Sequence, residues 1–78
     1  MSAKEMFEDL GYTYQESYFE EKLYEINYSK SGDYTPQIKF NLNHKCAMIY
    51  RQENKASGFD VKILQAINKQ VEELGWNE

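Results

Sequence analysis

Cysteine, histidine and proline are almost absent from this chain, where each occurs once, as Cys46, His44 and Pro36. A single cysteine excludes a disulfide within the chain. A structural zinc site needs about four Cys or His ligands, and Cys46 with His44 supplies two. We therefore expect no metal and no cofactor. A chain of 78 residues then depends on its packed core or on self-association for stability.

Long apolar runs are also missing. Charge appears at Lys4 and Glu5, where a secretory signal would have its apolar segment. No stretch approaches the roughly 20 apolar residues that span a bilayer. One free cysteine fits a reducing compartment. These features predict a cytoplasmic protein with no membrane contact.

Positive charge is scarce for a nucleic-acid binder, because the net charge is −4 and phosphate neutralisation supplies much of the affinity for nucleic acid. Acids dominate residues 1–33, whereas residues 34–58 carry more basic than acidic side chains. The basic residues of this middle segment are Lys39, Lys45, Arg51 and Lys55. A basic patch within residues 39–55, or an acidic surface that imitates nucleic acid, is a distant alternative for the function.

No constellation of catalytic residues stands out. His44 and Cys46 are two residues apart, but a histidine at a hairpin tip and a half-buried cysteine explain the pair, and nucleophilic catalysis also needs an orienting group and an oxyanion site. Adjacent acids such as Glu20 and Glu21 are typical of a solvated surface. The glycines stand singly beside helix ends or turns, so a phosphate-binding loop is not indicated. We expect no enzyme activity.

Aromatic residues, by contrast, are abundant, with seven tyrosines, four phenylalanines and one tryptophan. Disordered chains are poor in aromatic residues and rich in proline and charge. Large rings also bury much area at a small entropy cost. The composition therefore predicts a folded chain, and without an internal repeat or linker we expect a single domain over residues 1–78.

A short helix is predicted over Ser2–Leu10. Ser2 and Glu5 match the capping-box spacing, and Gly11 is placed to end the helix in a left-handed conformation. An apolar stripe follows the capping box, formed by Met6, Phe7 and Leu10. A helix of this length is unstable alone, so we expect the stripe to dock on the rest of the fold.

A longer amphipathic helix is predicted near the end of the chain. Residues 57–60 resemble a helix cap, and Gly75 with Trp76 matches a Schellman ending in which Trp76 packs back. Its apolar stripe is Phe59, Ile63, Ile67, Val71 and Leu74, joined by Leu64 and Ala66. Its polar face is Lys62, Gln65, Asn68, Lys69, Glu72 and Glu73.

Between the helices the hydrophobic period changes to two, which favours strands. The alternating segments are Tyr12–Gln15, Leu23–Ser29, Ile38–Asn43 and Cys46–Arg51, the last of them apolar on both faces over much of its length. Short turn-like connections at residues 31–33 and 43–45 imply antiparallel neighbours. The sequence predicts an α+β fold with an antiparallel meander of three to four strands and the long helix packed on one sheet face.

Two end segments resemble small uncharacterised proteins of phages and prophages of Gram-positive bacteria. They are residues 3–12, AKEMFEDLGY, and residues 65–76, QAINKQVEELGW. Together they make up about a quarter to a third of the chain. The resemblance implies a phage or mobile-element protein in the cytoplasm of a bacterial host. It implies no mechanism and no functional residues, because that group has no assigned activity.

The tyrosines are the candidate interaction residues. Tyrosine is enriched at protein interfaces, and the selected set is Tyr14, Tyr18, Tyr24 and Tyr28. Tyrosines on a helix-covered sheet face would explain the same composition without a partner. The leading hypothesis is a protein-binding module for a host or phage protein. The alternative is a structural, self-assembling protein, because an open meander leaves an edge strand unpaired.

Overall fold

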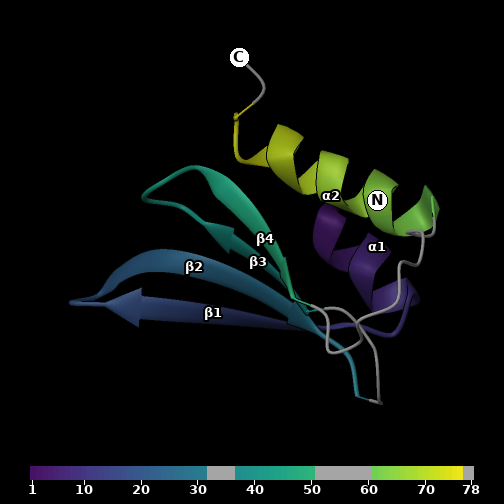
Figure 1. Ribbon diagram of the computed structural model, residues 1–78, viewed down its shortest axis with the longest axis horizontal. Helices are drawn as coiled ribbons and strands as arrows, with labels where there is room; N and C mark the ends of the chain where they lie inside the picture. The colour runs from purple at the N-terminus through teal and green to yellow at the C-terminus, as the bar shows by residue number, and fades with distance from the viewer. Residues whose placement is uncertain (32–36, 51–60, 77–78) are drawn as a thin grey trace.

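The computed structural model describes residues 1–31, 37–50 and 61–76 (Figure 1). Within these ranges four strands form one antiparallel sheet in the order β1-β2-β3-β4, and two helices lie side by side over one of its faces. The elements are α1 Ala3–Asp9, β1 Thr13–Phe19, β2 Lys22–Ser29, β3 Gln37–Asn41, β4 Cys46–Tyr50 and α2 Val61–Glu73. The predicted α+β fold with an antiparallel meander is confirmed.

Helix α1 is fixed at both ends by the residues that predicted it. The Ser2 Oγ accepts a hydrogen bond from the Glu5 N–H at 3.1 Å, and the Glu5 carboxylate accepts one from the Ser2 N–H at 2.9 Å. At the other end Gly11 has φ of 93°, and the Tyr12 N–H donates to the Phe7 carbonyl. These bonds complete a capping box and a Schellman motif. Local hydrogen bonds therefore stabilise both ends of this helix, which is only seven residues long.

Helix α2 ends in the same way. Gly75 has φ of 74°, and the Trp76 N–H donates to the Val71 carbonyl at 3.1 Å. Trp76 packs against the core, as the predicted Schellman ending requires. The predicted start at residues 57–60, with Phe59 in the stripe, lies outside the described residues.

The buried face of α2 is centred differently from the predicted stripe. Ala66 and Gln70 are buried, whereas Leu64 is 44% exposed. Leu64 lies about 100° around the helix from Ile63, so it points past the core. The other residues of the stripe are partly buried against the core, and they are Ile63, Ile67, Val71 and Leu74.

Aromatic rings make up most of the core. Phe7 of α1 stacks on Tyr28 of β2 with ring centroids 3.9 Å apart and planes 18° apart. Tyr28 meets Phe40 edge-on at 6.1 Å, and Phe40 contacts Trp76 at 6.3 Å. Tyr14 lies 5.4 Å from Tyr28 on the other side. One row of rings therefore crosses the sheet and joins both helices to it.

The hairpin between β1 and β2 turns through Glu20 and Glu21, both exposed and both with positive φ, at 50° and 66°. Left-handed conformations at both central residues suit tight hairpins but favour Asn and Gly. Because this pair carries no turn signature, the sequence pattern gave no sign of the hairpin. The observed β1 is also longer than predicted, since the segment Glu16–Phe19 continues the strand.

Candidate interaction surface

Tyr28 belongs to the core and not to a surface, so the prediction for this residue is wrong. It is fully buried, and its hydroxyl donates a hydrogen bond to the Gln70 side-chain oxygen at 2.5 Å. Burial, with smaller contributions from Tyr14 and Glu73, raises the pKa of the Tyr28 hydroxyl far above its ordinary value. Tyr28 lies on the side of β2 that faces the helices, where its ring stacks on Phe7 of α1. Alternation alone does not tell which side of a sheet the helices cover.

The other three predicted tyrosines do not form one surface. Tyr14 is half-buried beside the core, with the Lys4 Nζ 4.9 Å from its ring centre. Tyr18 is 57% exposed, and its hydroxyl donates to the Glu16 carboxylate at 2.7 Å, which raises its pKa. Tyr24 is half-buried on β2. The tyrosines therefore contribute mainly to packing, and of these four only Tyr18 presents most of its surface.

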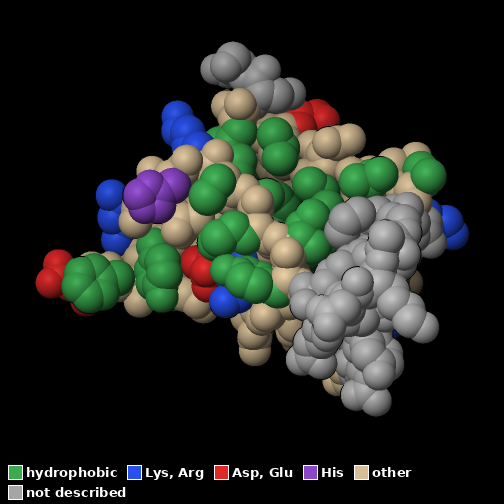
Figure 2. Space-filling view, in the orientation of Figure 1, with side chains coloured by type: hydrophobic (Ala, Val, Ile, Leu, Met, Phe, Trp, Pro, Cys, Tyr) green, Lys and Arg blue, Asp and Glu red, His purple; other side chains and the backbone are tan. Residues whose placement is uncertain are grey.

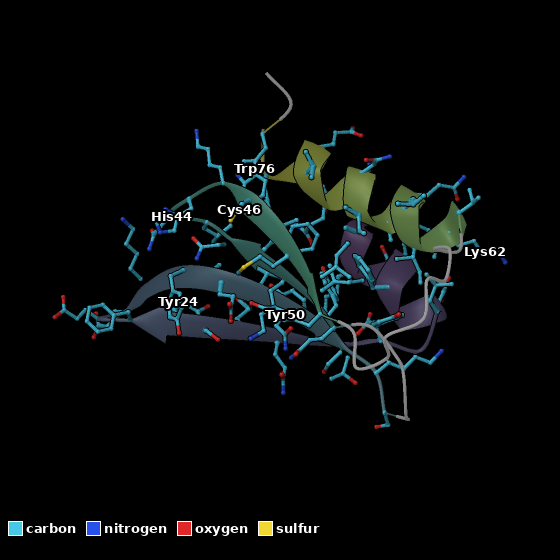
Figure 3. The ribbon with its side chains drawn as sticks, in the orientation of Figure 1. Tyr24, His44, Cys46, Tyr50, Lys62 and Trp76 are labelled. Atoms are coloured by element: carbon cyan, nitrogen blue, oxygen red, sulfur yellow. The ribbon has the colours of Figure 1, made fainter. Side chains whose placement is uncertain are left out.

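The extended apolar surface lies instead on β4, at one edge of the sheet. All five of its residues are uncharged, in the order Cys-Ala-Met-Ile-Tyr. Ile49 is 41% exposed and Tyr50 is 48% exposed. Cys46 is also exposed, which corrects the half-buried position expected for it. Figure 3 shows Cys46 and Tyr50 toward opposite ends of the strand, with His44 beyond the Cys46 end.

The outer backbone groups of β4 can be identified from the sheet register. The Leu42 N–H donates to the Tyr24 carbonyl, so the even-numbered residues of β3 direct their backbone groups toward β2 and the odd-numbered ones toward β4. Across β3 and β4, Lys39 with Met48 is then a hydrogen-bonded pair. Ala47 and Ile49 consequently point their N–H and C=O groups away from the sheet. No strand in the described ranges pairs with these four groups.

The opposite edge of the sheet, β1, is protected against added strands. Glu16 stands in the middle of β1 on the helix-facing side, because it pairs with the core residue Ile26. The register also shifts between Ser17 and Tyr18. Inward-facing charge and irregular pairing are devices that keep edge strands from joining other chains. Neither device is present in β4.

On the helix-facing side of the sheet, β4 carries an exposed apolar side chain. Ile49 lies on this side because it pairs with the core residue Ile38. On α2, Leu64 and Val61 are 44% and 63% exposed. Figure 2 shows hydrophobic side chains gathered over the middle of the visible face. A strand placed beside β4 would therefore find apolar contacts as well as backbone partners.

Two lysines flank β4. Lys39 lies across from Met48 on the face of the sheet away from the helices, with its Nζ 5.2 Å from the Tyr50 ring centre. Lys45 directly precedes β4 in an exposed turn with φ of 52°. Neither forms an ion pair with a carboxylate within the described ranges. Of the predicted basic segment, Arg51 and Lys55 lie outside those ranges.

The face of the sheet away from the helices is polar next to β4. Asn27 is only 7% exposed there and donates to the Gln15 side-chain oxygen at 3.3 Å. Its own Oδ1 is buried and accepts no hydrogen bond from the described residues. Lys39 pairs with Asn27 across the strands. This row of amides and a lysine gives the outer face a polar character that β4 lacks.

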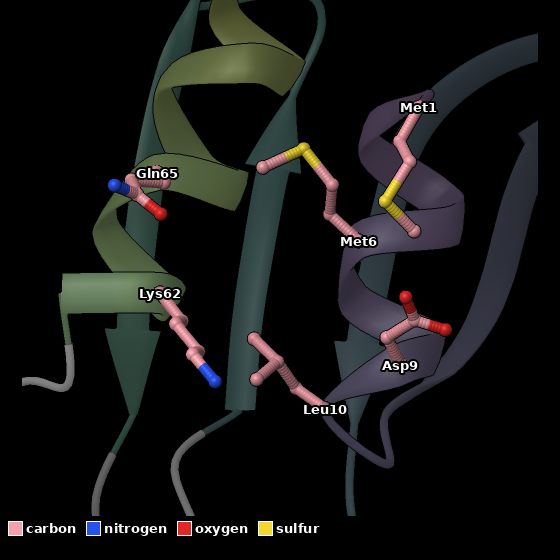
Figure 4. A pocket seen from close by; sticks show the side chains of 6 residues that line it. All are labelled: Met1, Met6, Asp9, Leu10, Lys62 and Gln65. Atoms are coloured by element: carbon pink, nitrogen blue, oxygen red, sulfur yellow. The ribbon is translucent and has the colours of Figure 1, made fainter.

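A groove of about 280 Å³ lies between α1 and α2 (Figure 4). Its lining residues are Met1, Met6, Asp9, Leu10, Lys62 and Gln65. Met6 and Leu10 reach toward α2, and Lys62 reaches back from α2 toward Leu10. Flexible apolar side chains of this kind accept apolar groups. The groove does not join the β4 surface, because it lies between the two helices.

The described ranges contain no cluster of three or more His, Cys, Asp or Glu residues that could hold a metal ion. No helix described by the structure is long and apolar enough to cross a membrane. No protein-family model matches the chain, and no curated protein or solved structure matches it. The candidate site therefore rests on the geometry of β4.

Proposed function

We propose that this chain is a small protein-binding module that binds its partner by strand addition at β4. The observation that carries the proposal is the contrast between the two sheet edges: β1 is charged and irregular, and β4 is regular, uncharged and exposed. In strand addition, main-chain hydrogen bonds give affinity and side-chain contacts on alternate positions give specificity. The proposal includes no catalytic role.

The setting belongs to the proposal as well. The resemblance of residues 3–12 and 65–76 to phage and prophage proteins supports a role in the cytoplasm of a Gram-positive bacterial host. The partner would then be a host protein or another phage protein. Neither segment includes β4, so the resemblance supports the setting and not the binding surface.

Simple energetics explains why both the backbone and the side chains of β4 matter. Ala47 and Ile49 offer one N–H and one C=O each, four groups in all. At about 0.5–1.5 kcal/mol net per hydrogen bond, these groups contribute roughly 2–6 kcal/mol. Micromolar binding needs about 8 kcal/mol after the cost of association is met. Apolar contacts from Ile49 and Tyr50 are therefore needed, and their exposure makes them available.

A proline at position 47 tests the proposal. Ala47→Pro removes an outward N–H and leaves the bonds between β4 and β3 intact, and proline is tolerated at such edge positions. We expect tagged wild-type protein to retain a specific partner from a Gram-positive bacterial lysate, and Ala47→Pro to lose at least 90% of it, on the order of a tenfold change in affinity. Ala47→Val, which keeps the N–H, serves as the control and should retain the partner.

Circular dichroism and urea unfolding of all three proteins establish that the variants are folded. Equal retention of the partner by the wild type and Ala47→Pro would contradict strand addition at β4, as would the absence of any specific partner. The self-assembly alternative has its own signature. It predicts a concentration-dependent oligomer in sedimentation that Ala47→Pro converts to a monomer.

A further inference from the structure

We propose that the segment that pairs with β4 is an extended apolar peptide flanked by acidic residues. This inference rests on the proposed function and adds the chemistry of the partner. It commits to a partner strand that is apolar opposite Ala47 and Ile49, with carboxylates near Lys39 and Lys45.

The described charges that border β4 are positive. Lys45 stands at one end of the strand, and Lys39 lies one strand inward on the outer face. Neither has a carboxylate partner in the described ranges. Among the described residues, the carboxylate nearest in register on this face is Glu25, which lies on β2, two strands from β4. Complementary charge directs both the encounter and the choice of partner.

The geometry lets a partner reach both lysines. A strand paired with the five residues of β4 spans about 17 Å. A residue just beyond its end at Cys46 lies beside Lys45. On the outer face, a partner residue opposite Met48, which pairs with Lys39, has its backbone about 10 Å from that of Lys39, two strand spacings away. Lysine and glutamate side chains together cover that distance. The Lys39 ammonium also extends toward β4, since it lies over the Tyr50 ring.

A second copy fits the same edge less well. Pairing β4 with β4 of another copy would gather two Lys39 and two Lys45 side chains at one interface. The described part of β4 has no carboxylate to offset them. Like charges brought together oppose association. The apolar side chains of Ala47 and Ile49 on the helix-facing side would accept either partner, so the charges decide between them.

A displayed peptide library tests the inference. Yeast cells carrying random ten-residue peptides are sorted for binding to the tagged wild-type protein and then for loss of binding to Ala47→Pro. We expect the peptides that pass both sorts to be enriched in Asp and Glu beside an apolar core. Lys39→Glu/Lys45→Glu should weaken them about threefold to tenfold, as exposed ion pairs do. Raising the salt concentration should weaken binding to the wild type and not to this variant.

Charge reversal elsewhere provides the matched control. Lys4→Glu/Lys22→Glu changes the net charge by the same amount, and both residues are exposed and lie on α1 and β2 away from β4. It should weaken the selected peptides by less than twofold. Equal weakening by the two double variants would mean that peptide affinity depends on the total charge of the protein and not on the charges beside β4. That result would overturn the inference.

The outcomes separate this inference from the proposed function. Peptides that depend on the Ala47 N–H but lack acidic residues would overturn the acidic partner and leave strand addition standing. A library in which every binder ignores Ala47→Pro would overturn both. A dimer in sedimentation that Ala47→Pro dissociates would identify the occupant as a second copy, and the acidic partner would be wrong.

Discussion

Phe7→Ala is expected to remove a large part of the folding stability of this protein. Phe7 is fully buried, and its ring stacks on Tyr28 and meets Tyr12 edge-on at 5.8 Å. Truncating a buried phenylalanine costs about 3–5 kcal/mol. A chain of 78 residues has roughly 4–12 kcal/mol in total. The loss is amplified here because Phe7 is the residue through which the short helix α1 is buried over β2.

The measurement for Phe7→Ala is urea unfolding followed by circular dichroism and by Trp76 fluorescence. Phe19→Ala is the matched control, because Phe19 is 69% exposed and should lose less than about 0.5 kcal/mol. A loss below about 1 kcal/mol for Phe7→Ala would contradict the packing of α1 on the sheet.

The hydrogen bond between Tyr28 and Gln70 is the second large effect. Tyr28→Phe leaves the buried Gln70 oxygen without its donor, so we expect a loss of about 1–3 kcal/mol. Gln70→Leu leaves the Tyr28 hydroxyl unsatisfied and should cost a similar amount. Tyr28→Phe/Gln70→Leu removes both polar groups and should lose less than the two single variants together. Additive losses in urea unfolding would show that the two groups do not depend on one another.

The same tyrosine predicts how stability changes in alkali. The folded-state pKa of Tyr28 is raised, chiefly by burial, above an unfolded value of about 10. Stability from this group is thus complete below pH 10 and falls as the pH rises further, because the unfolded chain loses the proton first. The slope reaches about 1.4 kcal/mol per pH unit. In Tyr28→Phe this contribution should disappear, which unfolding at pH 9 to 11 measures against the wild type.

The helix ends were predictable because their signals are local. Ser2 with Glu5, and Gly11 and Gly75, act within one turn of the chain, and the hydrogen bonds form as their spacing requires. The strands were predictable for the same reason, from alternation. The hairpin at Glu20 and Glu21 was not, because the pairing of β1 with β2 sets these exposed residues in a conformation that their side chains do not favour.

The binding surface was harder to predict because it depends on contacts distant in sequence. Which tyrosines are buried follows from the side on which α1 and α2 lie, and Tyr28 fell on that side. The burial of Gln70 likewise requires Tyr28 as its partner, 42 residues away. The apolar character of β4 on both faces was visible in the sequence. Such a strand usually lies inside a sheet, and its place at an edge became known only from the strand order.

Amide hydrogen exchange along β4 tests the open edge most directly. In the free protein at low concentration, the amides of Ala47 and Ile49 should exchange rapidly, while those of Met48 and Tyr50, bonded to β3, should be protected. Addition of a peptide selected for dependence on the Ala47 N–H should then protect Ala47 and Ile49. Protection of Ala47 and Ile49 in the free monomer, equal to that of Met48, would show that the edge is already covered and would contradict strand addition at β4.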